Sequence, residues 1–114
     1  MLESSEENVH INQIKLKPSR TRSAKQQRPI KVLIADDNSF NILILKQIIE
    51  FIRSVRVSIV TANDGEQALR AFLENNSKSS VHKIDLIFMD CEMPILDGCE
   101  AAKRIKRLVR EEGY

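Results

Sequence analysis

Acidic side chains follow two apolar runs of this sequence, at the point where each run ends. Asp36 and Asp37 come directly after the run at 30–35, and Asp90 follows the run at 84–89. If both runs are neighbouring parallel strands, the three carboxylates meet at one edge of a sheet. Like charges held that close repel each other, so a hard divalent cation or a proton is needed to share the site. The pattern therefore predicts an acid pocket.

From residue 29 onward, apolar runs alternate with segments of helical period. The first and third runs are apolar at nearly every position, which is typical of a parallel sheet that helices cover on both faces. The alternation predicts an α/β fold with the order β-α-β-α-β-α. The expected strands lie at 30–35, 55–61 and 84–89, and the expected helices at 40–52, 66–73 and 99–109.

Each expected helix has a start signal and an apolar stripe for packing. Asn38 or Ser39 can cap the first helix, and the turn signals Asn63-Asp64-Gly65 and Asp97-Gly98 open the other two. The stripes predict which side chains pack inward. They are Phe40, Ile44, Ile48 and Phe51/Ile52 in the first helix, Ala68, Leu69 and Phe72 in the second, and Ala101, Ala102, Ile105, Leu108 and Val109 in the third.

Length and charge divide the chain into two parts. At 114 residues, with 42% hydrophobic and 30% charged residues, there is room for one soluble domain. Residues 1–28 hold a basic stretch without acids, in a setting of Ser, Thr, Gln and Pro. We expect a disordered tail or linker there and a partial domain at 29–114. The stretch lacks interleaved aromatic residues, so the composition does not favour nucleic-acid binding.

The sequence also bears on location. Its acidic N-terminus is not followed by the apolar core of a secretory signal. The apolar stretch at 40–52 is too short and too polar to cross a bilayer, so we expect an intracellular, cytoplasmic segment without membrane contact. Cys91 and Cys99 form no CxxC or Cys/His cluster, which favours free thiols over a zinc site or a disulfide framework.

Taken together, the motifs at 29–114 resemble the receiver domain of two-component response regulators, particularly receivers attached to hybrid histidine kinases. Any one motif is weak, and their order and spacing make the resemblance specific. The motifs are Val-Leu-Ile-Ala-Asp-Asp-Asn at 32–38 with Asn41, Asn-Asp-Gly-Glu-Gln-Ala-Leu at 63–69, and Asp-Leu-Ile-Phe-Met-Asp-Cys-Glu-Met-Pro-Ile-Leu-Asp-Gly at 85–98.

The resemblance implies a flavodoxin-like, doubly wound parallel sheet in which the part present has strand order 2-1-3. It implies that Asp90 is the phosphoacceptor, which attacks the phosphohistidine of a histidine kinase or a histidine phosphotransfer protein. It further implies a Mg²⁺ cofactor, bound by Asp37 directly, by Asp36 through water, and by the backbone carbonyl of Glu92, beside Asp90. Met93, Pro94 and Gly98 are expected to shape the loop rather than to react.

The sequence departs from the family pattern at its C-terminal end. The pattern continues with a fourth strand that ends in Thr or Ser and a fifth that ends in Lys, whereas this chain stops at Tyr114. The hydroxyl and the lysine would contact the phosphoryl group and relay its presence. The resemblance therefore implies a C-terminally truncated receiver in which the third strand is an unpaired edge.

Two other functions are compatible with parts of the pattern. A degenerate, truncated receiver could act only as an interaction piece, without phosphoryl chemistry. A phosphatase of the haloacid-dehalogenase type also forms an aspartyl phosphate at a strand end. That family needs Asp-x-Asp, and this chain has Asp90-Cys91-Glu92, which misplaces the second acid by a methylene.

A domain of this size without its last two strands has little stability margin. We predict that the isolated polypeptide is marginal and aggregates readily. Calorimetry and light scattering during heating measure this directly. A sharp, cooperative transition of a monomer would show that the remaining core suffices.

Overall fold

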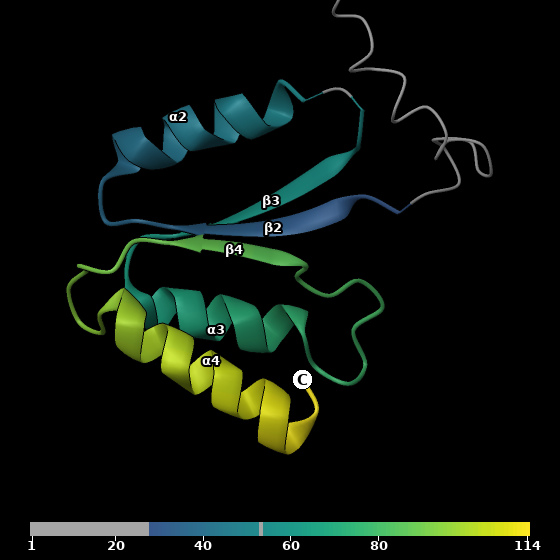
Figure 1. Cartoon of the computed structure of the whole chain (residues 1–114), viewed down its shortest axis with the longest axis vertical. Coiled ribbons are helices and arrows are strands. Elements are labelled where there is room, and N and C mark those ends of the chain that lie inside the picture. Colours follow the sequence, from purple (N-terminus) through teal and green to yellow (C-terminus); the bar gives the residue numbers. More distant parts are fainter. Residues whose placement is uncertain (1–27, 53) are drawn as a thin grey trace, which may run out of the picture.

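A small parallel sheet forms the centre of the molecule (Figure 1). The computed structural model describes residues 28–52 and 54–114. Three strands pair in the order β3-β2-β4, with Ala35 of the central strand opposite Ala62 on one side and Met89 on the other. These strands are β2 (Ile30–Ala35), β3 (Val57–Ala62) and β4 (Leu86–Met89). The predicted order 2-1-3 is confirmed.

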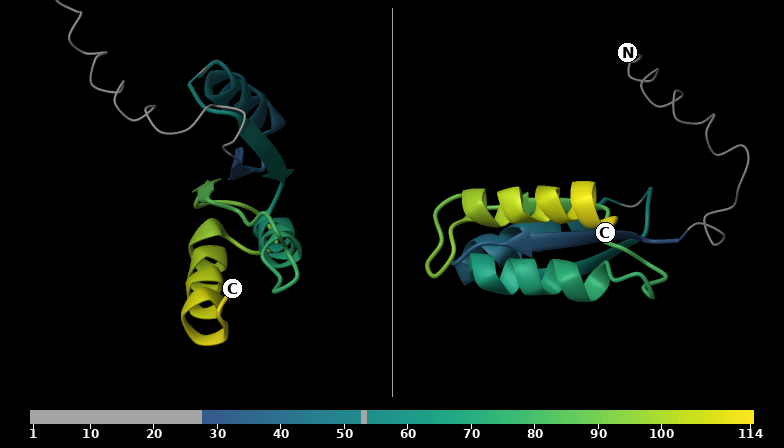
Figure 2. Two further views of the ribbon diagram at one scale, coloured as in Figure 1. Left: turned by 90° about the vertical axis from the view of Figure 1, so that its right-hand side faces the viewer. Right: turned by 90° about the horizontal axis from the view of Figure 1, so that it is seen from below.

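Helices cover both faces of the sheet, as the apolar strands predicted. Helix α2 (Ser39–Glu50) lies on one face, and α3 (Gly65–Asn75) and α4 (Gly98–Glu112) lie side by side on the other (Figures 1 and 2). Each crossover between parallel strands thus contains one helix. The element order confirms the predicted α/β fold.

The central strand divides the core into two layers because its side chains alternate between the faces. Val32 and Ile34 pack against Ile42 and Ile49 of α2. Leu33 and Ala35 face the other way and join a second cluster with Ala62, Ala68 and Met93. Because β2 supplies both layers, this one strand is the most deeply buried part of the chain.

The packing face of α2 differs from the expected stripe. Ile42 and Ile49 are buried, whereas Phe40 is 64% exposed and Ile48 is 58% exposed. This helix has apolar residues around most of its circumference, so its sequence contains two possible packing stripes. The predicted stripe, which begins at Phe40, is wrong. In α4, Val109 is likewise half exposed, although Ala101 and Ile105 are buried as expected.

β4 forms one edge of the sheet. Among the described residues its only strand partner is β2, and Leu86 and Phe88 are 47% and 40% exposed. Apolar side chains on an open edge strand favour pairing with other chains. The expected unpaired edge is therefore present in this part of the chain. The expected basic tail at 1–28 lies outside the described residues except for Arg28.

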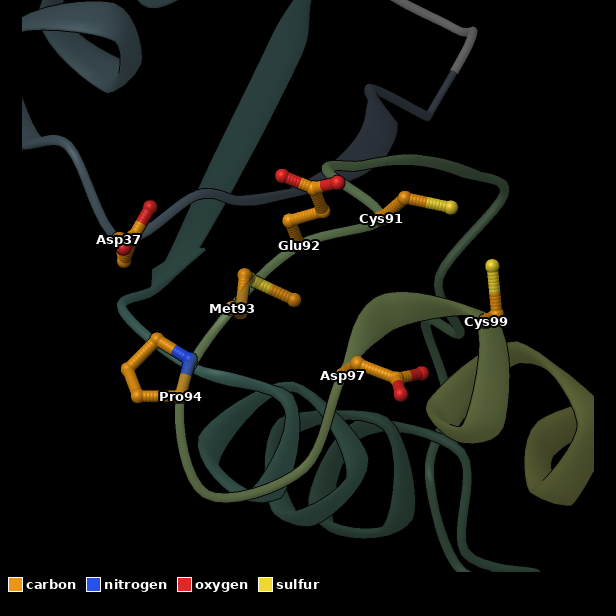
Figure 3. A pocket seen from close by; sticks show the side chains of 7 residues that line it. All are labelled: Asp37, Cys91, Glu92, Met93, Pro94, Asp97 and Cys99. Carbon is orange, nitrogen blue, oxygen red and sulfur yellow. The ribbon is translucent and has the colours of Figure 1, made fainter.

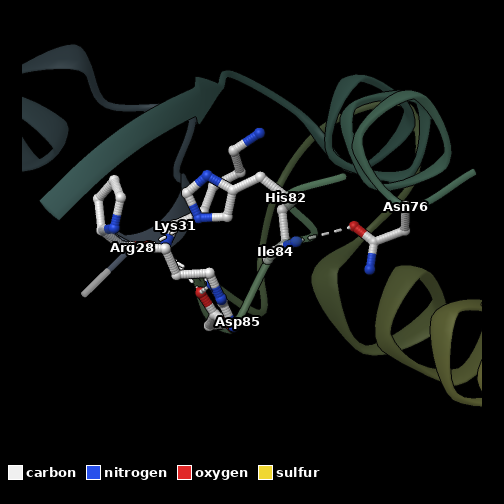
Figure 4. Close-up of polar contacts among 7 residues, drawn as sticks. Arg28, Lys31, Asn76, His82, Ile84 and Asp85 are labelled. Atoms are coloured by element: carbon white, nitrogen blue, oxygen red, sulfur yellow. Dashed lines mark hydrogen bonds and ion pairs between the residues drawn. The ribbon is translucent and has the colours of Figure 1, made fainter. Parts of the chain in front are cut away.

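Polar contacts close the sheet at the end where β2 and β4 begin (Figure 4). The Arg28 guanidinium donates two hydrogen bonds to the Asp85 carboxylate, at 2.9 and 2.8 Å, and the Lys31 backbone N–H donates a third at 2.8 Å. His82 Nε2 donates to the Pro29 carbonyl at 2.6 Å. The buried Asn76 side chain accepts from the Ile84 backbone N–H at 3.1 Å. The carboxylate of Asp85 therefore ties the start of β2 to the start of β4.

These bonds favour the charged carboxylate, and the Arg28 and Lys31 donors lower the pKa of Asp85 to about 2. Because the folded-state pKa is depressed, Asp85 contributes stability above pH of about 4 and loses it as the pH falls towards 2. We predict that Asp85→Asn lowers the urea midpoint at pH 6 and that the difference from the parent disappears near pH 2. A difference that is independent of pH would contradict the ion-pair assignment. Glu50→Gln, which changes an exposed acid of α2, is the matched control.

Candidate functional site

The site lies where the parallel strands end. The backbone N–H of Asp90 donates to the Ala35 carbonyl at 2.9 Å, and that of Asp36 donates to the Ala62 carbonyl at 3.1 Å. These bonds continue the ladder by one residue beyond the strands, so they fix the backbone from which both acidic side chains project. The carboxyl ends of parallel strands are where such folds bind their ligands.

The sequence-predicted acids Asp36, Asp37 and Asp90 come together at this edge. Each offers a carboxylate oxygen, and these oxygens all lie within 4.8 Å of one another. None of the three residues is buried, so water and ions reach the cluster. The cluster offers oxygen ligands, which suit a hard cation such as Mg²⁺. The chemistry of the donor set thus fits the expected metal.

Asp36 is held in place by its neighbours. One carboxylate oxygen accepts from the Asn38 backbone N–H at 2.9 Å, and the other accepts from the Asn41 side-chain amide at 3.3 Å. Asn38 in turn caps α2, because its side chain accepts from the Phe40 backbone N–H at 2.9 Å. The expected cap is therefore confirmed. Since both oxygens of Asp36 already accept hydrogen bonds, Asp37 has the freer carboxylate for direct coordination.

The loop between β4 and α4 carries the remaining predicted residues. Met93 is 8% exposed and belongs to the core cluster beneath the loop. The backbone N–H of Gly98 donates to the Cys91 carbonyl at 2.8 Å and closes the base of the loop. Ile95 has a φ of 70°, a left-handed conformation that costs free energy for a β-branched residue. The loop is thus anchored at its base and by one buried side chain.

Two glycines allow this loop to approach the helices closely. A Cβ at Gly98 would overlap the carbonyl oxygen of Asp90, and a Cβ at Gly65 would overlap the carbonyl oxygen of Leu96. Backbone atoms cannot move aside as a flexible side chain can. The expected loop-shaping role of Gly98 therefore has a steric basis. The equivalent role of Gly65 was missed, because a glycine directly after Asn-Asp is also typical of an ordinary turn before a helix.

Two surface depressions flank the acid cluster. One is lined by Asp36, Asn41 and Asp90 together with apolar side chains of β2, α2 and β4. The other is shown in Figure 3 and has Glu92 and Pro94 in its lining together with Asp37. It is lined by Asp37, Cys91, Glu92, Met93, Pro94, Asp97 and Cys99. Glu92, which the resemblance assigns to the metal site, therefore lies on the same depression as Asp37.

Cys91 and Cys99 share one end of the second depression, which sequence reasoning missed. Their side chains converge in Figure 3, and both residues are exposed and free. The neighbouring Cys99 thiol, through a hydrogen bond and its charge, raises the pKa of Cys91 most strongly, and the nearby carboxylates of Asp97 and Asp90 add to that effect. The residues are eight positions apart in the sequence, and only the loop geometry brings them together.

Comparison with known proteins identifies the architecture. The family model for the response regulator receiver domain matches residues 32–111. The chain belongs to the receiver domain family. Among curated relatives, it is 38% identical to "Hybrid signal transduction histidine kinase I" of Dictyostelium discoideum over 80% of this chain and 5% of that protein. It is 36% identical to "Osmolarity two-component system protein SSK1" of Saccharomyces cerevisiae over 82% of this chain and 12% of that protein.

Solved receiver structures agree with this assignment. The receiver domain of Ssk1, crystallised with the histidine phosphotransfer protein Ypd1 of Saccharomyces cerevisiae, superposes with a TM-score of 0.59 at 35% identity. The match covers 75% of this chain and 52% of that one. A variant receiver domain of the histidine kinase CKI1 from Arabidopsis thaliana gives a TM-score of 0.60 at 30% identity, covering 76% of this chain and 61% of that one. Both matches therefore span only part of the solved chain.

Among the described residues, no helix of this receiver is both long and apolar enough to span a membrane.

Charge crowding in the acid cluster generates a prediction about stability. Without divalent cations, Asp37→Asn should raise the urea midpoint, because it removes one of three mutually repelling charges. Added Mg²⁺ should stabilise the parent more than the variant, since only the parent keeps all three carboxylates. Glu50→Gln, at the other end of α2, should change neither quantity. A parent that Mg²⁺ does not stabilise would argue against a metal site.

Proposed function

We propose that this receiver accepts a phosphoryl group on Asp90, from a phosphohistidine and with Mg²⁺ as cofactor. One observation carries the proposal, namely the three carboxylates gathered at the carboxyl edge of a parallel sheet, with oxygen atoms within 4.8 Å of each other. Such crowding is unfavourable for stability, so it needs a functional reason. Membership of the receiver family supplies that reason.

Asp90 is the proposed nucleophile. Its backbone is fixed by the hydrogen bond to Ala35, and the residue directly follows the end of β4, where it lines one of the two depressions. A carboxylate oxygen of Asp90 attacks phosphorus, the bond from phosphorus to the donor histidine nitrogen breaks, and that nitrogen takes up a proton. The product is an aspartyl phosphate, an intermediate that carboxylates form in other phosphoryl-transfer proteins.

Asp36, Asp37 and the Glu92 carbonyl are the proposed metal-binding groups. A bound Mg²⁺ supplies positive charge that offsets repulsion between the incoming phosphoryl oxygens and the three carboxylates. Asp37 would bind it directly, whereas Asp36, whose oxygens accept bonds from Asn38 and Asn41, would act through water. Met93, Pro94 and Gly98 would shape the loop that keeps Glu92 on the same depression as Asp37.

The proposed donor is a histidine phosphotransfer protein or the phosphorylated domain of a histidine kinase. The Ssk1 receiver superposes on this chain and was crystallised with such a phosphotransfer protein. The acid cluster is open to solvent, as transfer between two proteins requires. We propose that this exchange takes place inside the cell, without a membrane or nucleic-acid partner for this segment.

The alternative is a receiver that only binds other proteins. It is favoured by a groove beside β4 whose lining includes Leu86 of β4 and Val109 of α4, two exposed apolar residues, together with Lys106. In that case the acids would be retained without phosphoryl chemistry. Phosphoryl-donor labelling distinguishes the two functions.

We predict that Mg²⁺ and acetyl phosphate add one phosphoryl group to the chain. Intact-mass spectrometry measures the addition, and hydroxylamine should remove it because an acyl phosphate is labile to that nucleophile. Asp90→Asn should abolish the addition, and omission of Mg²⁺ should reduce it by orders of magnitude. Glu50→Gln, which changes an exposed acid at the far end of α2, should still be labelled.

The controls decide between the two functions. Labelling that persists in Asp90→Asn would move the acceptor elsewhere. A folded parent that remains unlabelled under all conditions would favour the interaction role. Circular dichroism of each variant establishes that it is folded before labelling is compared.

A further inference from the structure

We propose that Cys91 and Cys99 form a redox pair, and that their intrachain disulfide slows phosphoryl acceptance at Asp90. Disulfide formation follows from the positions of the two thiols. The effect on phosphoryl acceptance rests on the proposed function.

The two thiols are close and accessible. Cys91 directly follows the acceptor strand and its terminal Asp90, Cys99 is in the first turn of α4, and both are exposed. Figure 3 shows their side chains converging at one end of the depression beside Asp37. Peroxide can therefore reach either sulfur from solvent, and the two side chains point towards each other.

A backbone hydrogen bond and a close approach hold the segments that carry the two cysteines near each other. The Gly98 N–H donates to the Cys91 carbonyl at 2.8 Å, so the residue before Cys99 is already bonded to Cys91. The lack of a side chain at Gly98 lets α4 start directly against the Asp90 carbonyl. A disulfide requires Cα atoms within about 7 Å and converging Cβ atoms. The hydrogen bond and the close approach hold the two segments together without a covalent bond.

The chemistry is balanced with one peroxide molecule. A thiolate attacks a peroxide oxygen, the O–O bond breaks, and a sulfenic acid and hydroxide form. The second sulfur then attacks the sulfenic sulfur, displacing its oxygen as water and forming the S–S bond. Both sulfur atoms are oxidised and the peroxide is reduced to two water molecules. A dithiol reductant reverses the modification by exchange.

The disulfide affects the acid cluster through its sequence neighbours. Asp90 and Glu92 lie on either side of Cys91, so a covalent bond between Cys91 and Cys99 restrains the backbone at both neighbouring positions. The metal-binding carbonyl of Glu92 and the attacking carboxylate of Asp90 must be well aligned. Misplacement by about 1 Å costs up to about a hundredfold in rate. The oxidised loop therefore holds the acceptor in a poorer geometry.

The first test measures mass and reversibility. Treated with hydrogen peroxide, the parent should lose the mass of two hydrogen atoms, stay monomeric on a non-reducing gel, and recover its mass in dithiothreitol. Because the sequence has two cysteines, a loss of this kind identifies the pair. Cys99→Ser should form no intrachain disulfide. A parent that keeps its reduced mass, or that forms only intermolecular dimers, would overturn the redox pair.

The second test compares phosphoryl acceptance from acetyl phosphate in reduced, oxidised and re-reduced protein. The rate should fall several-fold on oxidation and return on reduction. Cys99→Ser retains Cys91, Met93 and the other methionines, so an equal loss in that variant would assign the effect to oxidation outside the disulfide and overturn the coupling. An unchanged rate in the disulfide form would overturn it as well. If the reduced parent accepts no phosphoryl group, the proposed function fails together with the coupling, whereas the mass measurement still decides the redox pair.

Discussion

Electrostatic repulsion among three carboxylates is the constraint around which this receiver is organised. Asp36 and Asp90 follow paired strands, and the ladder hydrogen bonds to Ala62 and Ala35 leave their backbones little freedom to separate. The chain offsets part of the cost locally, since Asn38 and Asn41 donate to Asp36. The remaining repulsion favours binding of a cation, because a positive charge relieves it. A cation, or a phosphoryl group with its metal, therefore changes the free energy of the acid cluster more than it would change that of a neutral surface.

At the opposite end of the sheet, the acidic side chain is paired with hydrogen-bond donors. There Asp85 is matched by the Arg28 guanidinium and by the Lys31 N–H, so its charge is satisfied. The acids at the two ends of β4 therefore differ in their surroundings: Asp85 is paired with a cation, whereas Asp90 belongs to the acid cluster. The four residues of β4 separate the paired acid from the proposed acceptor.

Much of the fold followed from the sequence because several local signals agreed. The apolar run of β2 and the caps at Asn38, Asp64 and Asp97 indicated the same element boundaries to within a few residues. Strand order could not be read from the chain alone and entered with the family resemblance. The convergence of Asp36, Asp37 and Asp90 needed only the rule that parallel strands end at one edge.

Other features depended on tertiary packing that no local pattern encodes. In α2 the apolar residues surround the helix, so periodicity could not choose between the stripe of Ile42 and Ile49 and that of Ile44 and Ile48. The Arg28–Asp85 pair joins residues that are far apart in the sequence, and the meeting of Cys91 and Cys99 depends on how one loop turns. Nothing in residue type or spacing indicates either contact.

The close approaches at Gly65 and Gly98 have a consequence for how sequences of this kind can diverge. Both exclude a side chain for purely steric reasons, since the atoms in the way are the carbonyl oxygens of Leu96 and Asp90. That exclusion is indifferent to whether the acids carry out any reaction. A descendant that had lost its carboxylates would still need the two glycines to keep its shape. In a related domain without phosphoryl chemistry, Gly65 and Gly98 would therefore be kept longer than the three acids. The two glycines would then be the better evidence of common descent.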